Sequence, residues 1–547
     1  MNALLALTSA MAMALVIADP ETHHHHAPQL GSLSFETTCN QAAKAKFIEG
    51  LGWLHSFEYD DAERSFSAAA EADRRCGIAQ WGVAMSYYHP LWVPPTAAEL
   101  EKGRTAIGKA AAAGAGSQRE RDYIGALEAF YRDSDHVGHK ERALAYWAAM
   151  DQLHQRYPTD REAGIFYALT LIAAGTLDKD PEFTKEKQAA AILNAALEEN
   201  PEHPGVAHYL IHNFDYPPLA DLALPAARRY ASIAPASAHA QHMPSHIFTR
   251  LGLWDESINS NLASEAAAQA MMKAKGLSGA SREQLHAMDY LAYAYLQTGR
   301  DAEAQQVLSQ LNTIERVDEP VFSVAYAATA IPARLVLERR NWKAAASLQL
   351  SDNVRALTPL ENFKWAEAHV HFARAIGAAR SGNPAMARQE LALLGAIEQS
   401  LIVPPGTYDW RKPVSVERQI AEAWLVRAEG KSEDAVRMMR AAADLDDVTE
   451  KHPVTPGSVL PAREQLGELL RELGRPGEAL AEFEASLKRA PRRLAGLYGA
   501  ARSAQLAGNK GAAARYFAEL AEVTKASDGT LREVKEARTF AAEFAGR

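Results

Sequence analysis

Histidine and aspartate residues recur at helical spacing in three neighbouring stretches of the chain. The first stretch holds His208, His212 and Asp215, the second holds His239, His242 and His246, and the third holds His286, Asp289 and Tyr293. Side chains three, four and seven residues apart lie on one face of a helix. Imidazoles and carboxylates that converge from such faces are ligands for Zn, Cu or Fe(II).

A period of 34 residues relates these stretches to one another. His208 and His242 lie 34 residues apart, as do His212 and His246. We therefore expect one groove to present these ligand candidates: His208, His212, Asp215, His239, His242, His246, His286 and Asp289. Eight groups exceed the needs of one ion, so some would orient the ligands or a second ion would bind. Structural histidines, copied by repeat ancestry and hydrogen-bonded in a polar groove, are the alternative.

The same residues leave the reaction type open. The glutamate of an HExxH zinc-protease motif is missing, so that chemistry is not supported. Two histidines with Asp215 or Asp289 would form a facial triad with open positions for substrate or oxygen. The chain has no phosphate-binding loop, no G-x-S-x-G elbow and no CxxC pair. A metal-dependent hydrolytic or oxidative enzyme and a binding protein without turnover are both compatible with this pattern.

Pro244 lies between His242 and His246, within a stretch that is otherwise helical in pattern. Proline lacks a backbone donor and clashes with the preceding turn. The helix must therefore begin near Pro244 or kink there. Either arrangement would re-aim His242 relative to its neighbours.

A second histidine pair follows the same period. His55 and His89 lie 34 residues apart, and aromatic residues surround His89. We predict a ligand groove lined by His55, Tyr88, His89, Trp92 and Tyr293. Aromatic residues at helical spacing also form ordinary helix cores, which is the alternative interpretation.

Small residues at fixed offsets define the elements that position these side chains. Gly474, Ala479 and Phe483 are followed 34 residues later by Gly508, Ala513 and Phe517. A small residue at a tight turn and an alanine in the next helix allow two antiparallel helices to approach closely. The same offset of five recurs upstream in Phe57/Ala62, Gly252/Ser257, Gly299/Ala304, Asn341/Ala346, Gly382/Ala387 and Gly430/Ala435. The pattern predicts a series of helix-turn-helix units.

The stretch LRELGRPGEALAEFEASLKRAP closely resembles the tetratricopeptide repeat superfamily, and the resemblance covers about residues 40 to 525. It implies an all-α, right-handed superhelical solenoid of about ten helical hairpins. It also implies that the first helix of each hairpin lines a concave groove, which in this superfamily mostly binds peptides and proteins. The whole chain is also similar to long bacterial secreted repeat proteins of no established activity.

Composition narrows the classes of partner. The chain has 547 residues, more than one compact core usually holds. Its net charge is -10, and no basic block stands out. Nucleic acid is therefore not expected as the main partner, since phosphate binding needs clustered Lys and Arg.

The first residues predict export. Residues 1–18 are apolar and end in small residues, as in a secretory signal peptide, although no Lys or Arg precedes the apolar run. We therefore expect a periplasmic or secreted protein with no membrane span after signal removal. The tail that follows carries His23 to His26, which would either collect metal or have no specific role. Cys39 and Cys76 would lie at adjoining ends of a hairpin, where they could form a disulfide.

These observations divide the chain into regions. They are the signal peptide (1–18), the His-containing tail (19–38), N-terminal hairpins (39–200), His-rich central units (201–310), further hairpins (311–445), a loop (446–460) and C-terminal repeats (461–547). We predict an exported repeat protein whose groove holds a transition metal (Zn, Cu or Fe) or binds a peptide, protein or small molecule. A metal-dependent enzyme and an interaction protein without metal are the alternatives.

Overall fold

The computed structural model describes residues 28–91, 93–113, 116–178 and 180–545. The predicted signal peptide, the histidines of the tail and Trp92 lie outside these residues. Within them the secondary structure consists of helices and one isolated bridge, Ala280 with Val317. The all-α prediction is therefore confirmed. No helix among the described residues is long and apolar enough to cross a membrane.

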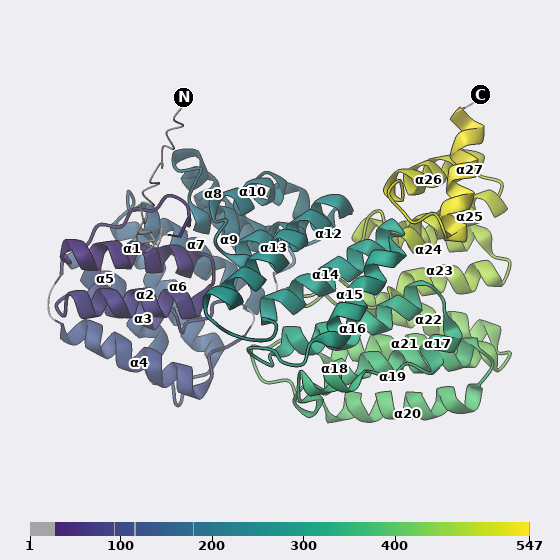
Figure 1. Ribbon diagram of the computed structural model, residues 1–547, viewed down its shortest axis with the longest axis horizontal. Coiled ribbons are helices and arrows are strands. Elements are labelled where there is room, and N and C mark those ends of the chain that lie inside the picture. Colours follow the sequence, from purple (N-terminus) through teal and green to yellow (C-terminus); the bar gives the residue numbers. More distant parts are fainter. Residues whose placement is uncertain (1–27, 92, 114–115, 179, 546–547) are drawn as a thin grey trace, which may run out of the picture.

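The helices pack into two hydrophobic cores, which define two lobes. The first core runs from Phe35 to Phe248 and the second from Trp254 to Ala537. The first lobe contains α1 (Gln41–His55), α2 (Tyr59–Ala72), α3 (Gly77–Met85), α4 (Ala97–Ala112), α5 (Gln118–Tyr131), α6 (His139–Arg156), α7 (Arg161–Asp178), α8 (Thr184–Glu199), α9 (Pro204–Phe214), α10 (Ala220–Ile233), α11 (Ala238–His242) and α12 (Pro244–Arg250). Figure 1 shows α1 to α7 on the left and α19 to α27 on the right.

The second lobe continues the same series of hairpins. It contains α13 (Trp254–Ala274), α14 (Arg282–Thr298), α15 (Asp301–Thr313), α16 (Phe322–Glu338), α17 (Trp342–Ala346), α18 (Asp352–Ala356), a short 3-10 turn (Leu360–Asn362), α19 (Lys364–Arg380), α20 (Pro384–Ser400), α21 (Arg411–Ala428), α22 (Ser432–Asp447), α23 (Ala462–Glu472), α24 (Pro476–Arg489), α25 (Leu494–Leu506), α26 (Lys510–Val523) and α27 (Arg532–Ala545). Consecutive helices pair from α1/α2 to α25/α26. The predicted solenoid of hairpins is therefore present.

The predicted turns are glycines in the left-handed region, followed five residues later by a buried small residue. Gly299 has φ 66° and Ala304 is 1% exposed. One unit differs from the prediction, because its left-handed residue is Arg340 (φ 51°) and its fully buried alanine is Ala345. The side chain of Asn341 caps α17 by accepting from the backbone of Ala344, which requires a negative φ at Asn341. The register of this turn is therefore one residue earlier than expected.

Each lobe closes on itself instead of leaving an open concave surface. In the first lobe, α1 meets α9, where His208 donates to the carbonyl oxygen of His55. In the second, α14 meets α25, and the backbone of Asp528 bonds to Gly299. These contacts join segments more than 150 residues apart, so they cannot be read from a repeat period.

A loop occupies the concave side of the second lobe. This inner loop (residues 448–461) connects α22 to α23 and corresponds to the region predicted as a loop. The carbonyl oxygen of Gly457 accepts from Tyr326 at 3.0 Å and from Arg334 at 2.8 Å, both on α16. The hydroxyl of Tyr408 donates to the carbonyl oxygen of Glu450 at 2.7 Å. The chain itself thus fills the surface on which a peptide was expected to bind.

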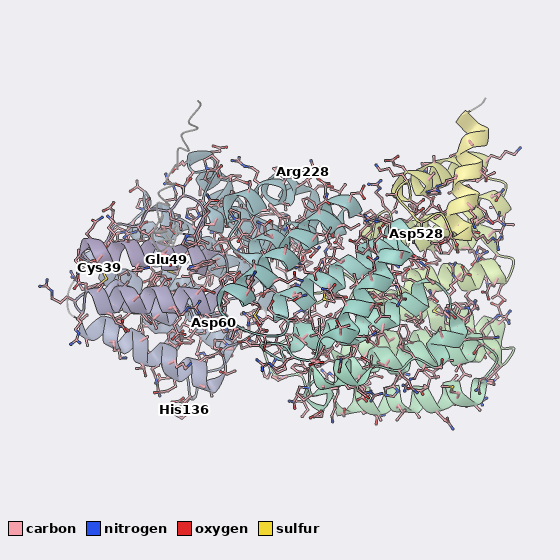
Figure 2. All side chains as sticks on the ribbon, viewed as in Figure 1. Cys39, Glu49, Asp60, His136, Arg228 and Asp528 are labelled. Atoms are coloured by element: carbon pink, nitrogen blue, oxygen red, sulfur yellow. A yellow bond between two sulfur atoms is a disulfide. The ribbon has the colours of Figure 1, made fainter. Side chains whose placement is uncertain are left out.

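Cys39 and Cys76 form a disulfide, as predicted, with Cα atoms 5.0 Å apart. Cys39 precedes α1 and Cys76 follows α2, so the bond ties the two ends of the first hairpin. Figure 2 shows Cys39 at the outer end of the first lobe. The bond therefore stabilises the start of the solenoid, away from the central helices that carry the histidines.

Candidate metal centre

Four helices near the junction of the two cores carry the clustered histidines. Helix α9 begins with Pro204, a position where its missing N–H costs nothing. Helix α11 is capped by Ser237 and ends at His242, and α12 begins at Pro244. The prediction that a helix begins at Pro244 is therefore confirmed, and the break re-aims His242 and His246. The fourth helix is α14, which carries His286.

Six of the predicted ligands converge in two groups. The first triad is His208, His212 and His239, and the second triad is His242, His246 and His286. In each triad, one possible ligand atom per residue lies within 4.8 Å of the others. The triads adjoin each other, since the ring centroids of His212 and His246 are 6.3 Å apart and those of His239 and His242 are 6.5 Å apart.

In the first triad, three Nε2 atoms face one another. The Nε2 atom of His208 lies 3.0 Å from that of His212 and 3.2 Å from that of His239. The Nδ1–H of His208 donates to the carbonyl oxygen of His55 at 2.6 Å. A neutral His208 therefore carries its free lone pair on Nε2, which points to the centre of the triad.

In the second triad, hydrogen bonds assign the protons of two rings. The amide nitrogen of Asn261 donates to the carbonyl oxygen of Ser257, so its Oδ1 is the acceptor that faces Nδ1 of His242 at 2.6 Å. The Nδ1–H of His246 donates to the carboxylate of Asp215 at 3.1 Å. Both neutral rings then have their lone pairs on Nε2.

These two lone pairs point at each other. The Nε2 atoms of His242 and His246 are 3.0 Å apart, and neither carries a proton to share. Two acceptors at this distance repel unless a cation or an added proton lies between them. A metal-bound histidine usually donates its other N–H to a carboxylate, amide or carbonyl oxygen. His208, His242 and His246 all show that pattern.

Five of the six triad histidines are held in the neutral form that metal binding needs. Burial, followed by the charge of neighbouring histidines, places the pKa of His208, His212, His242 and His286 well below 6.5. Burial also lowers the pKa of His246 to about 4, although Asp215 opposes the shift. Protonation of His242 or His246 is therefore unfavourable at neutral pH and does not relieve the repulsion between their facing lone pairs.

Aromatic rings enclose both triads. The ring of Phe57 lies 4.4 Å from that of His208 and 5.5 Å from that of His212, and Tyr230 stacks on His208. Tyr290 lies 4.8 Å from His242. Phe57 has φ 56°, a strained value for a bulky residue, at the position where other units place glycine. The strain is tolerated at the point where the ring covers the histidines.

The first triad is the more accessible of the two. The side chain of His239 is 12% exposed, whereas His242 is fully buried. The Nδ1 atom of His239 lies 3.8 Å from a carboxylate oxygen of Glu283. Burial alone would raise the pKa of Glu283, but the hydrogen bond and charge of His239 lower it to about 2. A nearby second acid, Glu58, receives a hydrogen bond from Ser237.

The two predicted aspartates are not among the converging donor atoms. Asp215 lies behind His246, where it also accepts from Arg250 at 2.7 Å and from Lys451 of the inner loop at 3.1 Å. It therefore orients a ligand. Asp289 bonds to the buried Arg334 and belongs to a different network. Asp289 lies one turn beyond His286 on α14, where Arg334 of α16 binds it.

The predicted ligand groove is not assembled. His55, Tyr88 and Tyr293 are all buried, and the hydroxyl of Tyr293 accepts a hydrogen bond from Arg493. His89 packs on Tyr59, with Glu99 at 3.9 Å. These side chains belong to the packed interior or its edge, since each lobe closes on itself. The alternative interpretation, that the aromatic residues form core, describes Tyr88 and Tyr293.

Several supporting residues have no signal in the sequence. Asn261 lies on α13, 19 residues from its partner His242, and Lys451 lies 236 residues from Asp215. Neither distance follows the repeat period. Phe57 is the exception, because its substitution for the usual glycine was visible in the turn pattern.

No family model matches this chain, and no curated protein matches it either. Solved structures to which this chain is similar include the APC/C hetero-tetramer Cut9–Hcn1, at 12% identity, over 90% of this chain and 76% of that one, with a TM-score of 0.33. Yeast Tom70 is 11% identical over 92% and 96% of the two chains, with a TM-score of 0.33. The TPR domain of P58(IPK) is 13% identical over 71% and 100%, with a TM-score of 0.21.

The fold stands on the chain's own geometry. Paired helices follow one another along the described residues, glycine turns recur between them, and a small buried residue follows each turn at a fixed offset. In these features the chain resembles the tetratricopeptide repeat superfamily.

Proposed function

We propose that this chain is an exported transition-metal-binding protein whose metal centre is built from the two histidine triads. The observation that carries the proposal is the pair of unprotonated Nε2 atoms of His242 and His246, 3.0 Å apart. Both Nδ1 atoms are already committed to oxygen acceptors. A metal ion between the Nε2 atoms converts this repulsion into two coordinate bonds, with His286 as a third ligand.

Two further features support the proposal. The Cys39–Cys76 disulfide is the kind of bond that persists in oxidising compartments, in agreement with the predicted signal peptide. The inner loop occupies the concave side of the second lobe, where an interaction protein of this type would hold a peptide. Binding of protein partners would then use the outer surfaces of the solenoid.

Metal analysis of the full-length protein tests the proposal. The four tail histidines are first replaced (His23→Ala, His24→Ala, His25→Ala and His26→Ala) so that they contribute no binding. We expect at least one equivalent of a transition metal per chain, by elemental analysis or after titration of chelator-treated protein. His242→Ala and His246→Ala should each abolish binding at the second triad, whereas His369→Ala should not. Less than a tenth of an equivalent, with no uptake on titration, would rule the proposal out.

Catalysis is a second candidate function, favoured by the number of ligands. Each triad supplies three imidazoles, and catalytic metal sites typically keep a fourth position open for water or substrate. The first triad is also partly accessible through His239. A hydrolytic or oxidative activity that appears on metal loading and disappears in His239→Ala would establish this function.

A further inference from the structure

The six histidines form two sets of three, and each set brings its own ligand atoms together. Ligand nitrogens lie about 2.0–2.1 Å from a bound metal, so two nitrogens on one ion are no more than about 4.2 Å apart. Within each triad the ligand atoms lie within 4.8 Å, which small side-chain shifts can close. The arrangement fits one ion per triad.

The charge around the triads disfavours two divalent ions. Each triad offers only imidazole nitrogens and no carboxylate or thiolate ligand. Of the nearby carboxylates, Asp215 pairs with Arg250 and Lys451, and Glu283 lies 3.5 Å from Arg282. Glu58 accepts a hydrogen bond from Ser237. Two divalent ions would therefore place a large uncompensated charge in the interior, which is costly. Two monovalent ions halve that charge.

The ligand number and surroundings agree with a monovalent ion. Structural zinc sites are almost always four-coordinate, and catalytic ones keep a water at the fourth position. Each triad supplies only three donors, and aromatic rings lie against them. Copper is the first-row metal with a stable monovalent state, and in that state it accepts three imidazoles in a plane. The aromatic rings of Phe57, Tyr230 and Tyr290 exclude water from the ligands and favour the lower charge state.

We propose that the two triads hold a pair of cuprous ions, one in each triad. This inference rests on the proposed function, because it assigns the metal and the stoichiometry of the same centre. The second triad, whose three members are all buried, holds its ion more tightly. The first triad, which reaches solvent at His239 beside Glu283, exchanges its ion faster.

A competition titration tests the pair. Full-length protein without the tail histidines is stripped of metal and titrated anaerobically with Cu(I) held by bicinchoninate, whose cuprous complex is coloured. We expect each chain to remove two equivalents of Cu(I) from the dye. His208→Ala and His242→Ala should each remove one equivalent, and the double variant none. His136→Ala, at an exposed position on the lower edge of the first lobe (Figure 2), should retain both.

The outcomes separate this inference from the proposed function. One equivalent in the unmodified protein, lost completely in either single variant, would overturn the pair. Return of Cu(I) to the dye when an equal concentration of Zn²⁺ is added would overturn the assignment of copper, while metal binding itself would stand. If the protein took up neither Cu(I) nor Zn²⁺, both the cuprous pair and the proposed metal-binding function would be wrong.

X-ray absorption on the loaded, unmodified protein gives a test that does not depend on variants that fold poorly. We expect an edge typical of Cu(I) and a shell of three nitrogen atoms at about 2.0 Å. A four-coordinate shell, or sulfur in the shell, would contradict the proposal. Circular dichroism of each variant verifies that the helices are retained, so that a loss of copper reports the ligand and not the fold.

Discussion

Two groups of buried histidines in this molecule use the same residue types in opposite ways. One is the buried Glu162 group, in which Glu162 lies between His55 and His203, and the other is the second triad. Both have three members close enough to hold a metal ion. In the Glu162 group, the carboxylate accepts from His55 at 3.0 Å and from His203 at 2.8 Å. The other ring nitrogen of His55 accepts from Tyr209 at 2.9 Å, and that of His203 accepts from the backbone N–H of Val206 at 3.3 Å.

The comparison shows that lone pairs, and not proximity, distinguish a metal site from a structural network. Every ring nitrogen of the Glu162 group has a protein partner, so a metal would have to displace hydrogen bonds to bind. In the second triad, two lone pairs face each other without a proton between them. A metal there relieves an unfavourable contact. We therefore assign a structural role to the Glu162 group and metal binding to the second triad.

The largest effect is expected from breaking the Glu162 group. Glu162→Ala leaves two buried histidines without their shared acceptor, and removing one partner of a buried charged network costs about 3–5 kcal/mol. Denaturant unfolding of the metal-free protein should show this loss, while metal uptake stays unchanged. Glu162→Gln, which keeps one acceptor oxygen, should lose less. Equal metal loss in Glu162→Ala and His246→Ala would contradict the distinction between the two regions.

The opposite result is expected for the second triad. His246→Ala removes one of the two facing lone pairs, so the metal-free protein should lose less stability than Glu162→Ala does. The stabilisation by metal should disappear, however, and it amounts to about 4 kcal/mol when the free metal is a thousandfold above its Kd. Unfolding curves with and without metal measure both quantities. A persisting metal-induced shift in this variant would mean that His246 is not a ligand.

A smaller effect is expected from the residue that orients His242. Asn261→Ala removes the oxygen that accepts from Nδ1 of His242, and loss of such support typically costs 10–100-fold in metal affinity, or about 1.4–2.7 kcal/mol. Asn261→Asp should act in the opposite direction, because a carboxylate makes the imidazole a stronger donor. Competition with a chelator of known affinity measures both. Equal metal affinities in the two variants would show that Asn261 does not support the metal centre.

The smallest effect, and the one that separates the two regions by pH, is expected on acidification of the metal-free protein. The pKa of His246 falls from 6.5 to about 4 on folding, mainly through burial. Its contribution to stability is therefore complete above pH 6.5 and is lost as the pH falls toward 4. Between pH 6.5 and 5.5 the loss is on the order of 1 kcal/mol for this group.

The stability contributed by the carboxylate of Glu162 should be lost at lower pH. Burial would raise the pKa of Glu162, but His203 and His55 lower it far below 4.5. Its stabilisation is therefore present above pH 4.5 and is lost only below that value. Unfolding measured at pH 7.5, 5.5 and 3.5 should show a first loss that is smaller in His246→Ala than in the unmodified protein by about 1 kcal/mol, because the other buried histidines still contribute. A single transition at the same pH in both proteins would contradict this assignment.

The repeat period explains how much of the candidate metal site could be predicted from the sequence. It placed His208 and His242, and His212 and His246, at equivalent positions, and the structure brings all four together with His239 and His286. Helix pairs stack in register along a solenoid, so equivalent positions become neighbours. Independently of the period, the missing backbone donor of Pro244 predicted a helix start or a kink, and α12 begins there.

What the period could not predict depends on contacts between distant segments. Asp215 and Asp289 looked equivalent as ligands, but Arg250 and Lys451 bind the first and Arg334 binds the second. The groove was predicted as an open surface, yet closure of each lobe buries it. The one-residue shift at Arg340 arises locally, from competition between a side-chain cap and the turn.

The inner loop also sets an order of assembly. Lys451 reaches Asp215 across 236 residues of chain, so the carboxylate that orients His246 acquires its last partner only after more than four-fifths of the protein has been made. The six histidines are all present long before that point. A chain ending before the inner loop would carry every ligand and lack part of the frame that aims them. The second triad thus acquires its complete support only when the inner loop has packed against the first lobe.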